Sequence, residues 1–293
     1  MPKYIFLDNW VYSRLTDAEN ERRLSAFINH KGYTILITTL SFVELYNPNW
    51  EKAGEKDRMN RAAHFLSKHP SVIISPEKVW QAETKSYPNP LSLLPIDLDL
   101  QNISNQLRAP TLLSFLKGDD LFIKQGKSIE LWQAEYEQIK GTWLNTVGNI
   151  IEQACQSNNL KKDENGRFIE LQKYKEQFLL SLDFRIADPN DIDSLLKILI
   201  EKSKKGEKFR LTAVRLSSLY FWYSYIYIDQ ANKMKHNGSD IGDFYHISLL
   251  PYCSAFTTDG SMYRMLKRIV EPIVPTGCEV ITPYKLDKIL SRY

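Results

Sequence analysis

Short apolar runs alternate with amphipathic segments at both ends of the chain. Apolar runs predict strands that are buried on both faces, and they occur at residues 4–7, 33–38, 72–75, 255–258 and 279–282. Segments with apolar residues three or four positions apart predict helices, and they occur at residues 10–29, 41–46, 50–68, 77–85, 239–250, 261–269 and 284–293. The break between 41–46 and 50–68 is the run Asn47-Pro48-Asn49. Strands that alternate with helices are typical of an α/β fold with a central parallel sheet.

Two details of the early helices affect where candidate residues lie. Residues 10–29 form either one helix or two shorter helices that are separated near Thr16 and Asp17. Ser41 is a suitable N-cap for the next helix, which places Glu44 on the first turn of that helix.

The middle of the chain has a different character. Pro88, Pro90 and Pro95 end the α/β pattern, and the segment that follows is amphipathic and helical, without a convincing strand. The simplest organisation is one α/β domain formed by residues 1–87 and 238–293, with a large all-α insertion at residues 88–237. Such insertions are tolerated when their two ends lie close together.

Composition and charge narrow the class of protein. With 43% hydrophobic and 25% charged residues, the 293-residue chain has the composition of a soluble globular protein. Its net charge of +3 is compatible with binding to an acidic polymer but is too small to indicate such binding. The scattered Cys155, Cys253 and Cys278 indicate reduced thiols. Since no export signal and no apolar run of membrane-spanning length is present, we expect a cytoplasmic protein that does not enter a membrane.

Acidic residues follow several of the predicted strands. Asp8 and Asp259 come directly after apolar runs, and Glu44 lies near the start of the helix after the second strand. One face of a late helix carries three further candidates, Asp240, Asp243 and His246. Because the carboxyl ends of parallel strands meet at one edge of a sheet, we expect these side chains to converge there.

A cluster of carboxylates is unfavourable unless a cation balances it, because like charges raise the pKa of some members. An all-oxygen ligand set suits Mg²⁺ or Mn²⁺ better than zinc. Such a metal can bind a phosphodiester, activate a water molecule and stabilise the leaving oxygen. The cluster therefore favours metal-dependent hydrolysis of a nucleic-acid backbone.

Three segments, YIFLDNW, TTLSFVELY and SDIGDFYHISLLPYCSAFTTDGSMYRML, together resemble the PIN-domain nucleases. The resemblance covers roughly the first 80 and the last 55 residues, and the long central segment departs from a minimal domain of that family. It implies a three-layer α/β/α fold with a 3-2-1-4-5 parallel sheet, and metal-dependent ribonuclease chemistry. The family's acids fall on Asp8, Glu44, Asp243 or Asp240, and Asp259, and its hydroxyl beside the last acid falls on Thr258.

Other residues are candidates for supporting roles. Asn9 and Ser41 could orient the ligands through hydrogen bonds, whereas a lone histidine such as His246 is more often a hydrogen-bonded packing residue than a ligand. A basic run could contact a phosphate backbone, although most such runs are simply solvated surface; its members are Lys202, Lys204, Lys205, Lys208 and Arg210.

We therefore expect an endonuclease that acts on nucleic acid, with single-stranded RNA favoured over DNA. The alternative is a catalytically inactive PIN-like module that serves as a protein- or nucleic-acid-binding scaffold. A phosphatase of the haloacid-dehalogenase type would need an acid at residue 10, where this chain has Trp10. A homodimer or a cognate protein partner is compatible with either expectation.

Overall fold

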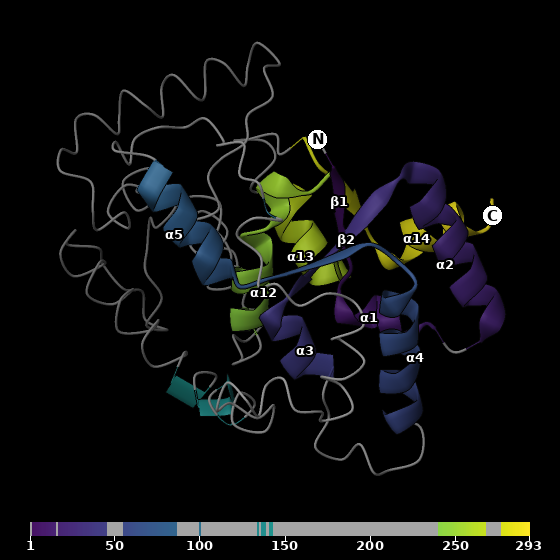
Figure 1. Cartoon of the computed structure of the whole chain (residues 1–293), viewed down its shortest axis with the longest axis horizontal. Coiled ribbons are helices and arrows are strands. Elements are labelled where there is room, and N and C mark those ends of the chain that lie inside the picture. Colours follow the sequence, from purple (N-terminus) through teal and green to yellow (C-terminus); the bar gives the residue numbers. More distant parts are fainter. Residues whose placement is uncertain are drawn as a thin grey trace, which may run out of the picture.

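A five-stranded, all-parallel sheet organises the computed structural model of the chain (Figure 1). The structure describes residues 2–15, 17–45, 55–86, 100, 134, 136–138, 141–142, 240–267 and 277–293. The strands are β1 (Lys3–Phe6), β2 (Tyr33–Thr38), β3 (Ser71–Ile74), β4 (Ala255–Thr257) and β5 (Glu279–Ile281). All five lie where apolar runs predict them, which confirms an α/β fold with a parallel sheet.

The strand order is β3-β2-β1-β4-β5. The central strand β1 pairs with β2 and β4, so that Ile5 lies opposite both Ile35 and Ala255. Strands from the two ends of the chain therefore build one sheet, in the order that the family resemblance implies. The sequential direction of the strands reverses between β1 and β4, which makes this junction the topological switch point of the sheet.

Helices follow each strand and connect it to the next. They are α1 (Asn9–Ser13), α2 (Ala18–Lys31), α3 (Thr39–Leu45), α4 (Glu55–Ser67), α5 (Pro76–Ser86), α12 (Asp240–Ile247), α13 (Gly260–Met265) and α14 (Pro283–Leu290), with a 3-10 turn at η1 (Leu250–Tyr252). The first predicted helical segment is thus two helices. Asp17 separates them because its carboxylate accepts the Asn20 backbone N–H at 2.8 Å and caps α2.

Both faces of the sheet are buried. Ile5, Ile35 and Ile281 point toward a single apolar cluster that includes residues of α1, α2, α4 and α14. The next residue along β1, Phe6, points to the opposite face, where its ring packs 4.7 Å from that of Phe256. Side chains of this size contribute about 1.5–3 kcal/mol each when fully buried. Their burial on both faces stabilises the sheet whose carboxyl edge carries the acidic residues.

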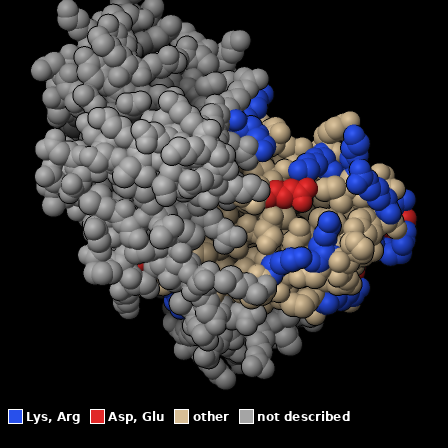
Figure 2. Space-filling view, turned by 90° about the horizontal axis from the view of Figure 1, so that it is seen from above, with Lys and Arg blue, Asp and Glu red and all other residues tan. Residues whose placement is uncertain are grey.

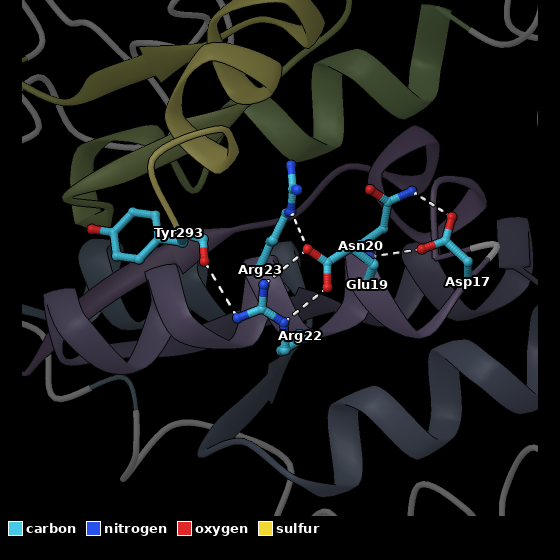
Figure 3. Close-up of polar contacts among 6 residues, drawn as sticks. All are labelled: Asp17, Glu19, Asn20, Arg22, Arg23 and Tyr293. Carbon is cyan, nitrogen blue, oxygen red and sulfur yellow. Dashed lines mark hydrogen bonds and ion pairs between the residues drawn. The ribbon is translucent and has the colours of Figure 1, made fainter.

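The last residue of the chain is held against α2 (Figure 3). Glu19 pairs with Arg22 and Arg23 along the surface of this helix. Arg22 also donates from Nη1 to the Tyr293 carbonyl at 3.3 Å, and the Tyr293 ring lies edge-on to Phe27 at 5.9 Å. These contacts hold the chain beyond α14 beside α2, away from the acidic residues considered below.

One local prediction is wrong. α3 begins at Thr39, not after Ser41, because the Thr38 hydroxyl at the end of β2 accepts the Ser41 backbone N–H at 2.9 Å. Ser41 therefore lies inside the first turn, and Glu44 lies near the carboxyl end of the helix instead of on its first turn. The strand passes directly into the helix, with Thr38 acting as the capping residue.

The expected all-α insertion lies outside the described residues except for Leu100, Ala134, residues 136–138, Gly141 and Thr142. The basic run from Lys202 to Arg210 also lies outside them. Among the described helices, none combines the length and the apolar character that crossing a bilayer requires.

Candidate functional site

Asp8 and Asp259 mark the carboxyl edge of the sheet at the switch point. Each lies two residues beyond the end of a strand, after β1 and β4 respectively, and these strands are hydrogen-bonded neighbours. Each is also the N-cap of the helix that follows. Crevices at such switch points are where open α/β sheets bind ligands.

The two carboxyl groups are in different environments. Asp259 is exposed, and its Oδ1 accepts the backbone N–H groups of Ser261 and Met262, each at 2.8 Å. The pKa of Asp8 is raised to about 6, chiefly by burial and in part by the negative charges of Glu44 and Asp259. The charge of His246 and the backbone N–H of Asn9 offset only part of this increase. Asp8 is therefore an acid whose ionised form lacks sufficient positive charge around it.

Thr257 fixes the backbone at Asp8. Its hydroxyl accepts the Asp8 backbone N–H at 2.7 Å and donates to the Phe6 carbonyl at 3.1 Å. The side chain is fully buried, and it joins the ends of β1 and β4. Sequence analysis missed this residue, although a hydroxyl at the end of an apolar strand is a signal that could have identified it.

Glu44 is held by donors from three separate segments. Its Oε2 accepts the side-chain amide of Asn9 and lies 3.2 Å from Nε2 of His246. Its Oε1 accepts the Tyr136 hydroxyl at 3.3 Å. The side chain stays 23% exposed, so these contacts orient the carboxylate without sealing it from solvent.

His246 links this cluster to β2. The ring is buried against Phe6, with the ring centres 4.9 Å apart. Nδ1 lies 3.3 Å from the Thr38 hydroxyl, which in turn lies 2.8 Å from the hydroxyl of Ser41. Burial alone would lower the pKa of His246, but the charge and hydrogen bond of Glu44, followed by other nearby acids, raise it overall. The imidazole therefore favours its charged form beside Glu44.

The structure places three of the four predicted supporting residues, Asn9, Ser41 and His246, in one network. Asn9 and His246 contact Glu44 directly, and Ser41 reaches His246 through Thr38. α3 and α12, which carry Glu44 and His246, lie side by side (Figure 1). The network therefore joins segments that are distant in the sequence.

The remaining candidates are placed less completely. Asp243 is half-buried on α12, and its negative charge acts on both His246 and Tyr136. Asp240 is the first residue of α12, but its side chain falls outside the described part of the chain. Thr258 is fully buried, and its hydroxyl has no hydrogen-bond partner among the described residues.

A hard divalent cation suits the chemistry of these residues. Their side chains offer carboxylate oxygens, and burial together with the neighbouring carboxylates raises the pKa of Asp8, so that a cation would favour its ionised form. Two more oxygens adjacent in sequence to the acids, Asn9 Oδ1 and Thr258 Oγ1, are buried without a partner among the described residues. In that same part of the chain, no three His, Cys, Asp or Glu side chains are gathered as a group that could hold a metal ion. The charges of the acids therefore act on one another, but the described side chains do not form a complete set of metal ligands.

No protein-family model matches the chain, and comparisons with curated proteins and with solved structures find no significant match.

Proposed function

We propose that the chain is a PIN-like endonuclease that uses Mg²⁺ or Mn²⁺ to hydrolyse phosphodiester bonds, with single-stranded RNA as its substrate. The proposal includes a three-layer α/β/α domain at residues 1–87 and 238–293 and a helical insertion at residues 88–237. It rests mainly on one observation, the raised pKa of Asp8 at the switch point, beside the charges of Glu44 and Asp259. Carboxyl groups perturbed in this way gather at functional sites.

In this proposal Asp8, Asp243 and Asp259 hold the cation together with Glu44, and Asp240 supports them. A bound Mg²⁺ or Mn²⁺ supplies an activated water molecule and stabilises the charge that develops on the phosphate. Asn9 and His246 keep the Glu44 carboxylate oriented, and Thr257 holds the backbone of Asp8 in place. These contacts meet the need of such a site for well-positioned ligands.

Charge on the described surface is compatible with a polyanionic substrate. Figure 2 shows one face of the molecule, on which Lys and Arg side chains of the described part are more widespread than Asp and Glu side chains. Positive charge of this kind attracts a phosphate backbone without reading its sequence. We propose RNA and not DNA as the substrate only because the resemblance to the PIN-domain nucleases implies a ribonuclease.

A second candidate is a catalytically inactive PIN-like scaffold that binds a protein or nucleic-acid partner. The observation in its favour is His246, whose raised pKa supplies a positive charge inside the acidic cluster. Such an internal cation reduces the need for a metal. Calorimetric titration with Mn²⁺ separates the candidates, because the nuclease requires binding at the acidic edge whereas the scaffold does not.

The direct test is cleavage of labelled single-stranded RNA and DNA with Mg²⁺, with Mn²⁺ and with chelator. We expect cleavage of RNA that needs the metal and is lost in Asp8→Asn. Asp17→Asn is a matched control, because the Asp17 carboxylate caps α2 by accepting the Asn20 backbone N–H, and asparagine also serves as an N-cap. Metal-independent cleavage, or full activity in Asp8→Asn, would contradict the proposal.

A further inference from the structure

The acidic edge includes a residue from the central part of the chain. Tyr136 lies 92 residues after Glu44 in the sequence, and its hydroxyl reaches Glu44 Oε1 at 3.3 Å. Asn9 and His246 occupy the other carboxylate oxygen, Oε2. Tyr136 therefore makes a contact that neither of the other two donors duplicates.

Packing around this contact leaves no spare room. A methyl group added at Gly242 on α12 would lie 2.7 Å from Glu44 Oε1 and 3.2 Å from the Tyr136 hydroxyl. The backbone of α12, the end of α3 and Tyr136 thus meet at a single oxygen atom. Because α12 also carries Asp243 and His246, this junction sets the position of Glu44 relative to the other acids.

The chemistry of Tyr136 indicates a role for its hydroxyl and not for its ring. The side chain is only 8% exposed, so the ring is not available to stack on a nucleobase. The hydroxyl of a tyrosine ordinarily keeps its proton up to about pH 10, so at neutral pH it acts as a donor to the Glu44 carboxylate, 3.3 Å away. A donor of this kind orients a carboxylate by satisfying one oxygen.

We propose that Tyr136 is a positioning residue of the acidic site, whose hydroxyl holds the Glu44 carboxylate in the orientation required for binding Mg²⁺ or Mn²⁺. The inference rests on the proposed function and adds that the central segment contributes directly to the site. It predicts that the affinity for the cation depends on a hydroxyl far from the predicted ligands in sequence.

The experiment is calorimetric titration of the full chain with Mn²⁺, using wild type, Tyr136→Phe and Tyr252→Phe. The control is matched because the Tyr252 hydroxyl also donates to a carboxylate, that of Glu83 on α5, outside the acidic site. We expect Tyr136→Phe to weaken Mn²⁺ binding roughly tenfold and Tyr252→Phe to change it less than twofold. Thermal unfolding without metal shows whether each variant keeps its fold.

A second variant, Gly242→Ala, tests the same junction while keeping the tyrosine. The added methyl group should displace Glu44 Oε1 and weaken Mn²⁺ binding at least as much as Tyr136→Phe. If wild type and a correctly folded Tyr136→Phe variant bind Mn²⁺ equally well, this inference is overturned. The proposed function then still stands, because the protein binds the metal. Should Tyr136→Phe not fold, unchanged binding by Gly242→Ala overturns it instead. Wild type that binds no Mn²⁺ overturns both proposals.

Discussion

Nε2 of His246 lies 3.2 Å from Oε2 of Glu44, which joins α12 to α3 across 202 residues of sequence. Because the pKa of His246 is raised in spite of its burial, the charged imidazole, which forms an ion pair with Glu44, persists to a higher pH than that of an isolated histidine. The acidic edge therefore has a positive charge of its own, and the stability of the fold depends on the protonation of this histidine.

Replacing His246 by glutamine removes the charge but keeps a hydrogen-bond donor. We expect the free energy of unfolding to fall by about 1 kcal/mol near pH 6, because a hydrogen bond from a charged donor is replaced by a weaker one from a neutral amide. A raised pKa stabilises the fold fully below the ordinary value of about 6.5, and this contribution disappears as the pH rises through the folded-state value. Urea unfolding of both proteins between pH 6 and 9 should show the difference shrinking with pH. A difference that grows over that range would contradict the ion pair.

Asp8→Asn should stabilise the protein when metal is removed by chelator. The pKa of Asp8 is about 6 in the fold, against 3.8 ordinarily, so ionisation of Asp8 opposes folding. The wild type should lose stability between about pH 4 and 6, by up to about 3 kcal/mol, since one pKa unit corresponds to about 1.4 kcal/mol. The asparagine variant avoids this loss, so we expect it to be the more stable protein above pH 6, while the gap closes near pH 4.

Urea unfolding across this pH range, with Asp17→Asn as the control, measures the effect. Saturating Mn²⁺ should narrow the gap at pH 7, because a cation that binds the wild type favours its folded state. An asparagine variant that is less stable than wild type at pH 7 in chelator would show that the Asp8 carboxylate stabilises the fold by itself.

Thr257→Val tests how the backbone of Asp8 is fixed. Valine matches threonine in shape but cannot pair with the Asp8 N–H or the Phe6 carbonyl. Leaving a buried polar group unpaired costs about 1–3 kcal/mol, so we expect a loss of stability of that order together with weaker Mn²⁺ binding.

Thr257→Ser is the matched control, because it keeps the hydroxyl and loses only a methyl group, worth about 0.8 kcal/mol. Urea unfolding and Mn²⁺ calorimetry on both variants separate the two effects. A valine variant that matches wild type, beside a serine variant that is less stable, would mean that packing of the methyl group, and not the hydroxyl, accounts for the role of Thr257.

The sheet could be predicted from sequence because each strand is a short apolar run. The predicted strand at residues 33–38 coincides with β2, and the others agree to within a residue or two. The start of α3 could not be predicted in the same way, since Thr38 belongs to the strand and caps the helix as well. A local sequence pattern assigns each residue to one element, so it does not show that Thr38 both ends the strand and caps the helix.

The site was predictable only in part. The general rule that parallel strands end at one edge brings Asp8 and Asp259 to the same region, and the structure agrees. The contacts around Glu44 depend on how α3, α12 and a distant tyrosine pack together. Tyr136 has no local signal, because nothing near it in the sequence indicates a carboxylate partner. The ligand set and the activity remain predictions.

The central place of β1 has a consequence for synthesis of the protein on the ribosome. β1 is synthesised long before its partner β4, which begins only at Ala255. Until then one side of the first strand is an open edge, which is prone to mispairing. A nascent chain that ends before α12 also lacks Asp243, His246 and Asp259, so the acidic centre is assembled only after Asp259 has been synthesised.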